Sequence, residues 1–154
     1  MGAKFSGKEL PHDSARLHVS GTAAYTDDLP EPRGLLHMAI GMSSKAHAKI
    51  KKLDLSAVLA APGVVDVFVA DEIPGENNCG PIEHDEKIFN PDVVEYVGQA
   101  IFAVAAETVD QARRAARKAA IDYEELDAIL DPLEAVEKES FVLPTETLKR
   151  GEPG

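Results

Sequence analysis

Apolar and polar residues alternate along three stretches in the first half of the chain, and each alternation predicts a strand. The stretches are residues 35–44, 46–56 and 64–70. In the first stretch, apolar side chains at every second position share one face: Leu36, Met38, Ile40 and Met42. The polar triplet 43–45 is short enough to join the first two strands as a hairpin.

A short helix is predicted between the second and third strands, with Ser56 as its N-cap and Pro62-Gly63 at its end. After the third strand, residues 71–92 are polar and rich in turn-forming residues. A loop of this length in a compact domain usually has a functional or interfacial role. Residues 71–92 are therefore a candidate surface for a partner or a ligand.

Residues 93–106 are mainly apolar and predict a strand that is buried on both faces and interrupted at Gly98. The Gly98-Gln99 step has two interpretations: an approach of the backbone to a cofactor, or a bend in a core strand. A glycine inside a strand commonly marks a bulge, which favours the bend.

Residues 108–119 carry the clearest helix signals in the chain. Thr108 is the predicted N-cap, and Gln111 three residues later completes a capping box. Small side chains at helical spacing form one stripe, and basic side chains face outward: Ala112, Ala115, Ala116 and Ala119 against Arg113, Arg114, Arg117 and Lys118. A strand over 120–126 follows, and then a helical turn that begins at Pro132.

These elements predict an α+β fold with about five or more strands and two main helices. Residues 1–10 lack periodicity and predict a disordered or extended lead. The turn-rich segment that follows is expected to run over the surface, held by Leu17, Val19 and Tyr25. The folded domain is expected over residues 11–139, followed by a linker over 140–154.

The formal net charge of −11 argues against a nucleic-acid-binding protein, because such a surface repels phosphates. Basic residues nevertheless cluster at 45–52 and 113–118, and this segregation is compatible with docking on a partner. No signal peptide or membrane-length apolar run is recognised, and the single cysteine, Cys79, fits a reducing compartment. These features predict a cytoplasmic protein that does not contact a membrane.

Candidate chemistry is sparse. The five histidines are scattered without metal-ligand spacing, and no glycine-rich phosphate motif is present. Cys79 lies among acidic residues, which disfavour the thiolate that a nucleophile requires. No catalytic, cofactor-binding or metal-binding residue is therefore predicted, and the chain is expected to be a module of something larger.

Several motifs occur in an order that resembles one family. They are Gly-x-Ala-x-Tyr-x-Asp-Asp at 21–28, Ser-x-Ala-His-Ala-x-Ile at 44–50, Pro-Gly-Val-Val at 62–65, Ile-Pro-Gly-Glu-Asn at 73–77 and Val-Gly-Gln at 97–99. The chain resembles the α/β hammerhead domain of the aldehyde oxidase and xanthine dehydrogenase family, from Pro11 to about Pro153. Pro-His-Asp-Ser at 11–14 favours the xanthine dehydrogenase branch, in which this domain opens the large subunit.

The resemblance implies a mixed-sheet hammerhead fold and a molybdenum hydroxylase that oxidises purines with oxygen from water. It implies molybdopterin, [2Fe–2S] clusters and FAD in the intact enzyme, with NAD as the final acceptor, and none of these cofactors in residues 1–154. The implied partners are the C-terminal molybdopterin-binding domains of the same subunit and an iron–sulfur/FAD subunit.

In this interpretation the chain is a scaffold without the active site. The candidate interface residues are Tyr25, Asp27, Asp28, Leu29, Ile82, Phe89, Gly98 and Gln99. Three alternatives remain open at this point: a related aldehyde oxidase-type module, a stand-alone interaction domain, and a small-ligand-binding module with the long loop as a lid.

Overall fold

The computed structural model describes residues 7, 9–82 and 84–152, which divide into one unit up to Leu35 and another from Leu36 onward. The predicted lead over 1–10 lies mostly outside the described residues. In the shorter unit, a helix that the turn-rich sequence did not predict, α1, spans Ala15–Ser20, and a 3-10 turn, η1, spans Thr26–Asp28. All three residues expected to hold this segment are largely exposed: Leu17, Val19 and Tyr25.

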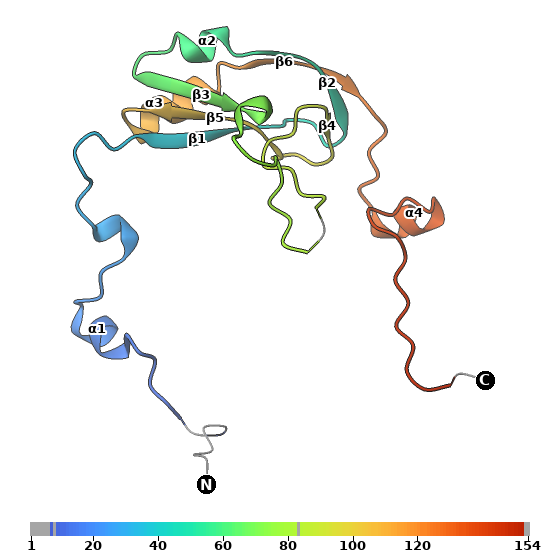
Figure 1. Cartoon of the computed structure of the whole chain (residues 1–154), viewed down its shortest axis with the longest axis horizontal. Coiled ribbons are helices and arrows are strands. Elements are labelled where there is room, and N and C mark those ends of the chain that lie inside the picture. Colours follow the sequence, from blue (N-terminus) through green and yellow to red (C-terminus); the bar gives the residue numbers. More distant parts are fainter. Residues whose placement is uncertain (1–6, 8, 83, 153–154) are drawn as a thin grey trace. The chain divides into compact units, whose positions relative to one another are not determined.

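The second unit contains two three-stranded sheets, in which every pairing is antiparallel (Figure 1). The first has the order β1-β5-β3, with β1 at His37–Met42, β5 at Ala100–Ala106 and β3 at Val64–Val69. The second has the order β4-β2-β6, with β4 at Val93–Val94, β2 at Ala48–Asp54 and β6 at Ala120–Glu125. With the helices described below, this arrangement confirms the α+β class.

The predicted hairpin between the first two strands is wrong, because β1 and β2 lie in different sheets. The backbone N–H of Ser43 donates to the carbonyl of Gln99 over 2.8 Å, and the N–H of Gly98 donates to the carbonyl of Ser43 over 2.8 Å. Ser43 therefore continues the pairing of β1 with the segment before β5. The chain crosses to the second sheet instead of folding back.

Gly98 lies where the chain leaves the second sheet after β4 and enters the first as β5. Its φ of +95° is in the left-handed region, which favours glycine. A Cβ on Gly98 would meet no atom within 4 Å, so the backbone conformation, and not a lack of space, explains the glycine. The interruption predicted at Gly98 is a turn between two sheets.

The two short helices differ in how well their starts were predicted. Helix α2 spans Ser56–Leu59, and Ser56 is not its N-cap, because the Ser56 hydroxyl donates to the Asp54 carboxylate over 2.6 Å. The same carboxylate accepts from the Ser56 N–H over 3.0 Å and so takes the place of the predicted cap. Helix α4 spans Pro132–Glu137 with the proline in its first turn, as predicted, and Asp131 caps it.

Helix α3 spans Val109–Ala116 and packs against the first sheet (Figure 1). The predicted N-cap is confirmed, because the Thr108 hydroxyl accepts from the Gln111 N–H over 3.2 Å. In a full capping box the Gln111 side chain would accept from the Thr108 backbone N–H. Here it accepts from the Thr108 hydroxyl instead, over 3.0 Å. The alanine stripe faces inward as predicted within the helix, with Ala112 and Ala115 fully buried and Ala116 half-buried. The helix ends at Ala116, so Ala119, which was predicted to belong to it, lies in the connection to β6.

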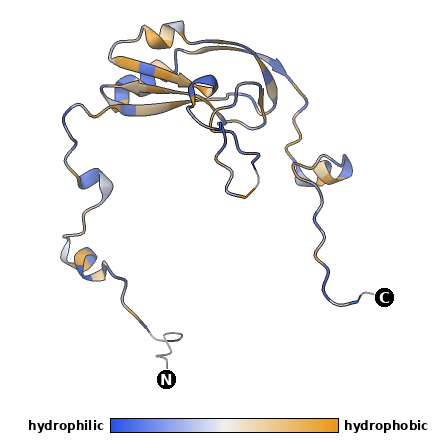
Figure 2. Cartoon of the chain, in the orientation of Figure 1, coloured by the Kyte–Doolittle hydropathy of each residue, from blue (hydrophilic) through white to orange (hydrophobic). Residues whose placement is uncertain are grey.

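The core lies between this helix and the first sheet and continues beneath the second sheet. Its largest buried side chains are Phe102, Ile101, Val58, Val94 and Val104. Strand β5 is central in its sheet and is buried on both faces from Ile101 onward, as its apolar sequence predicted. In Figure 2, the strands of the first sheet are mostly orange, while the long loop carries several blue stretches.

We expect Ala115→Leu to lower the free energy of unfolding by about 1–3 kcal/mol, because the added carbons have no space between α3 and the sheet. The exposed neighbour offers a control: Arg114→Ala should change stability by less than about 0.5 kcal/mol. Urea denaturation of both variants measures the difference. Similar losses in the two variants would mean that the buried face of α3 is assigned incorrectly.

Candidate functional site: the long loop and the groove beside β1

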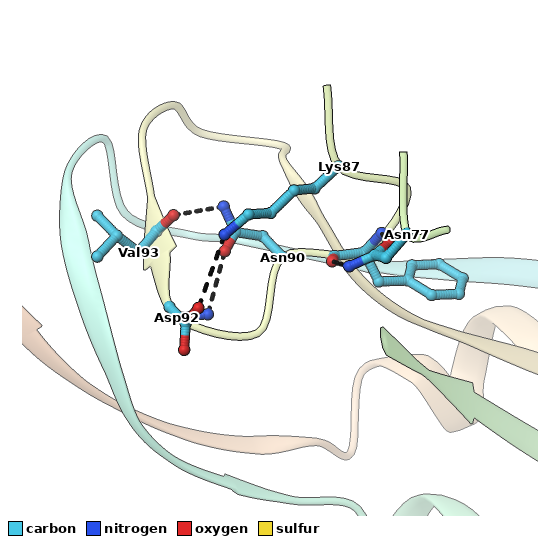
Figure 3. Close-up of polar contacts among 6 residues, drawn as sticks. Asn77, Lys87, Asn90, Asp92 and Val93 are labelled. Atoms are coloured by element: carbon cyan, nitrogen blue, oxygen red, sulfur yellow. Dashed lines mark hydrogen bonds and ion pairs between the residues drawn. The ribbon is translucent and has the colours of Figure 1, made fainter. Parts of the chain in front are cut away.

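The long loop after β3 is closed by one side chain. The Asn77 amide nitrogen donates to the Phe89 carbonyl over 2.6 Å, and the Asn77 amide oxygen accepts from the Phe89 N–H over 2.9 Å (Figure 3). The side chain thus satisfies both backbone groups of a residue twelve positions later. Phe89 itself is only 8% exposed, so the base of the loop is anchored to the core.

Asn90 fixes the return of the loop to the sheets. Its side-chain nitrogen donates to the Val93 carbonyl, and its side-chain oxygen accepts from the Asp92 N–H over 3.1 Å (Figure 3). Its backbone N–H donates to the Ala100 carbonyl over 2.8 Å. Lys87 and Asp92 form an exposed ion pair over 3.6 Å at the same corner. The Asn90 residue itself is buried, with 3% of its surface exposed.

Gln99 is also part of this internal scaffold. Its side-chain oxygen accepts from the Glu95 N–H over 2.8 Å, and its carbonyl accepts from Ser43. The side chain is 8% exposed. These contacts explain the Gly98-Gln99 step as a structural turn, and a partner at this position would contact the turn as a whole more than the Gln99 side chain.

The remaining candidate interface residues are exposed. Ile82, at the tip of the long loop, is 85% exposed. In the shorter unit, Tyr25 and Leu29 flank η1, which contains Asp27 and Asp28. The Asp28 carboxylate accepts from the Tyr25 N–H over 2.9 Å, and the Tyr25 hydroxyl contacts Nδ1 of His18 over 3.1 Å. These contacts shape the turn and leave its apolar side chains open to solvent.

Chemistry-bearing side chains do not gather in the described part of the chain. No group of three or more His, Cys, Asp or Glu side chains is placed there to hold a metal ion. The exposed Cys79 lies near the backbone carbonyl of Glu86, and His84 lies 3.5 Å from Glu76. The residues present do not form a metal-holding set, so we derive no chemical step for this chain.

A groove runs beside β1 and was not foreseen from the sequence. Its volume is about 530 Å³, and five consecutive residues of one strand and its end line it, Ala39 to Ser43. Helix α3 contributes Arg113, Ala116 and Arg117 to the opposite wall, and Val97-Gly98 lies at the groove as well. The only sequence signal was the small pair Ala39 and Gly41 between larger apolar residues in β1.

The apolar stripe predicted in β1 faces solvent. Met38, Ile40 and Met42 are 59%, 43% and 57% exposed, while Gly41 on the other face is buried. On β3, at the other edge of the same sheet, Val65 and Phe68 are also exposed. Five large apolar side chains therefore lie open on the strands of the first sheet, which is the kind of surface that marks an interaction site.

Most of the basic cluster at 45–52 is neutralised inside the chain. Lys45 pairs with Glu125 over 2.5 Å, and Lys49 and Lys51 both pair with Glu124 on the adjacent strand β6. The hydrogen bond from Lys51 lowers the pKa of Glu124 and raises the pKa of Lys51. The second basic cluster differs, because Arg114 pairs with Asp110 while Arg113 and Arg117 have no ion pair with any described residue.

The sequence matches the family described as "Aldehyde oxidase and xanthine dehydrogenase, a/b hammerhead domain" over residues 20–127. The chain belongs to this family. The hammerhead chain is 47% identical to a xanthine dehydrogenase of Oryza sativa over 135 residues, which cover 88% of this chain and 10% of that protein. It is 42% identical to aldehyde oxidase 2 of Rattus norvegicus over 146 residues, covering 94% of this chain and 11% of that protein.

The hammerhead chain also superposes on a solved structure. The aldehyde oxidoreductase of Desulfovibrio desulfuricans matches with a TM-score of 0.76 and 28% identity, over 90% of this chain and 16% of that one. The chain thus spans about a tenth of the length of the curated relatives that it matches. No helix among the described residues is long and apolar enough to cross a membrane.

Proposed function

We propose that residues 1–154 form the N-terminal domain of a xanthine dehydrogenase large subunit, which oxidises hypoxanthine and xanthine in purine catabolism. In the overall reaction, the purine gains an oxygen from water and loses two electrons, which pass through iron–sulfur clusters and FAD to NAD. The observation that carries this proposal is the 47% identity to a xanthine dehydrogenase over 88% of the chain, confined to 10% of that relative's length. The enzyme is proposed to be cytoplasmic.

Within this enzyme, the domain acts as a scaffold, and molybdopterin, the [2Fe–2S] clusters and FAD are held by other domains. Exposed apolar side chains at Tyr25, Leu29 and Ile82 support docking on the molybdopterin-binding domains and the iron–sulfur/FAD subunit. The Asp27-Asp28 turn, which Tyr25 and Leu29 flank, and the separate Gly98-Gln99 turn are held by internal hydrogen bonds. Such fixed turns suit an interface that forms without rearrangement.

The experiment is to purify the native protein with an antibody raised against the 154-residue chain. We expect a polypeptide several times as long as this chain, because the matched region is 10% of the relative's length, purified together with the iron–sulfur/FAD subunit. The purified complex should contain molybdenum, iron and flavin and reduce NAD with xanthine. A native 16.5 kDa protein without these groups would instead favour the stand-alone interaction domain.

The substrate class needs its own test, because the chain is also 42% identical to aldehyde oxidase 2 of Rattus norvegicus. The same preparation serves for this test. We expect xanthine and hypoxanthine to be oxidised faster than an aromatic aldehyde, with NAD preferred to oxygen as the acceptor. Faster oxidation of the aldehyde would move the assignment to the aldehyde oxidase-type module.

A further inference from the structure

The groove beside β1 lies along the edge of a sheet. It follows five successive residues of the strand and its end, Ala39 to Ser43, and α3 forms its other wall. Strand β1 pairs only with β5 and ends the order β1-β5-β3, so its other edge has no strand partner among the described residues. Unpaired backbone groups of this kind are a template for a further strand.

Strand β1 also supplies side-chain contacts for such a strand. Met38, Ile40 and Met42 expose apolar surface at alternate positions of β1, and the last two line the groove. An added strand would present its own alternate side chains to them, as in the recognition of peptides by strand addition. Because α3 forms one wall of the groove, one face of the added strand would lie against this helix.

The charge of the groove wall indicates which kind of segment would bind there. Arg113 and Arg117 are one helical turn apart, both line the groove, and neither forms an ion pair with a described residue. Guanidinium groups bind carboxylates with two parallel hydrogen bonds, so this wall fits an acidic segment. If a second copy of this chain paired through its own β1, the arginine pairs of both copies would lie at the same interface. Repulsion between these like charges disfavours that pairing.

A second hollow adjoins the groove and shares Met42 and Arg117 with it. Tyr123 lines this hollow, and its hydroxyl is buried without a hydrogen-bond partner. A buried hydroxyl in this state destabilises the fold by about 1–3 kcal/mol.

We propose that the free edge of β1 receives an extended acidic segment, which adds a strand to the first sheet and places carboxylates against Arg113 and Arg117. The segment comes from outside residues 1–154, in the longer polypeptide of the proposed function, on which this source rests. The groove is thus a docking site for a defined strand, distinct from the apolar contacts at Tyr25, Leu29 and Ile82.

The test uses the 154-residue chain and three fluorescein-labelled peptides that alternate valine with aspartate, serine or lysine. We expect the aspartate peptide to bind about tenfold more tightly than the serine peptide, and the lysine peptide not to bind. Salt should weaken the binding of the aspartate peptide, because the contacts are between exposed charges. Fluorescence anisotropy at two salt concentrations measures all three.

Matched double variants show whether peptide binding depends on the two arginines of the groove or only on the overall charge of the helix. Arg113→Glu/Arg117→Glu should abolish the preference for the aspartate peptide, and Arg114→Glu/Lys118→Glu, with the same charge change on the same helix, should keep it. Hydrogen exchange followed by NMR should show protection of alternate amides in residues 38–42 when the aspartate peptide is bound, because an added strand bonds to every second residue.

Three outcomes would overturn the proposal: no preference for the aspartate peptide, equal losses in the two double variants, or binding without protection in residues 38–42. The assay needs no other domain and no enzyme activity. Its failure would therefore leave the xanthine dehydrogenase assignment standing. Failure of the purified native protein to oxidise xanthine would in turn leave the peptide site standing and remove only the proposed source of the segment.

Discussion

Replacing Gly41 with valine is expected to destabilise the domain by about 3 kcal/mol or more, the largest effect of any substitution proposed for this chain. Gly41 is opposite Phe102 in the β1–β5 register. A Cβ on Gly41 would lie far inside van der Waals contact with the Phe102 ring. That ring is 1% exposed and packed in the core, so moving it aside would disrupt its contacts with the core side chains.

A double-mutant cycle tests this cause. Phe102→Leu removes part of the ring and costs stability by itself, but Gly41→Val should then cost less than it does beside phenylalanine. Thermal or urea unfolding of the four proteins gives the coupling. Gly34→Val, in the shorter unit, is a less suitable control, because the left-handed φ of +81° at Gly34 would strain a valine there. Met38→Val, on the same strand with an exposed side chain, should change stability little. Equal costs of Gly41→Val in both backgrounds would contradict the ring contact.

Sequence signals predicted correctly those features that depend only on neighbouring residues within one helix. Thr108 caps α3 and Pro132 opens α4 because capping depends on residues within one turn. The alanine stripe predicted the buried face of α3, because helical periodicity and burial coincide there. The family motifs predicted the hammerhead fold by resemblance, and the match over residues 20–127 confirmed it.

Long-range pairing was not available from the same signals. The triplet 43–45 has the length of a hairpin turn, yet Ser43 bonds to a segment more than fifty residues later. The alternation in β1 predicted a strand but not which face is covered, since the small face of Ala39 and Gly41 packs under α3 and Phe102. The groove between β1 and α3 depends on both of these tertiary facts, so no local pattern could predict it.

The polar residues of the long loop were also underestimated by sequence reasoning. Asn77 was noted as the end of a family motif and Asn90 only as a member of a turn-rich segment, and neither was given a structural role, because asparagine is common in loops. In the structure each side chain binds backbone groups of other residues and fixes the loop to the core. These bonds to backbone groups distinguish the two asparagines from ordinary turn residues, and such bonds have no periodic sequence signal.

Asn90→Ala is therefore expected to lower the free energy of unfolding by about 2–3 kcal/mol. The substitution leaves the Val93 carbonyl and the Asp92 N–H without their side-chain partners at a buried position, and each unsatisfied group costs about 1–3 kcal/mol, less where water reaches it. Asn78→Ala is the matched control in the same loop, since among the described residues the Asn78 side-chain oxygen accepts only from the Gly80 N–H two residues away. It should cost less than about 1 kcal/mol.

Asn90→Asp distinguishes the two bonds of this side chain. A carboxylate still accepts from the Asp92 N–H, but it faces the Val93 carbonyl without a proton to donate. Burial and this carbonyl should raise the pKa of the new carboxyl in the folded state above its unfolded value. The folded variant then binds the proton more tightly than the unfolded chain, so its deficit relative to wild type should shrink as the pH falls through the folded pKa. Urea unfolding of both proteins between neutral and mildly acidic pH measures the difference, and a deficit that is constant or grows on acidification would show that the Val93 contact does not hold Asn90 in place.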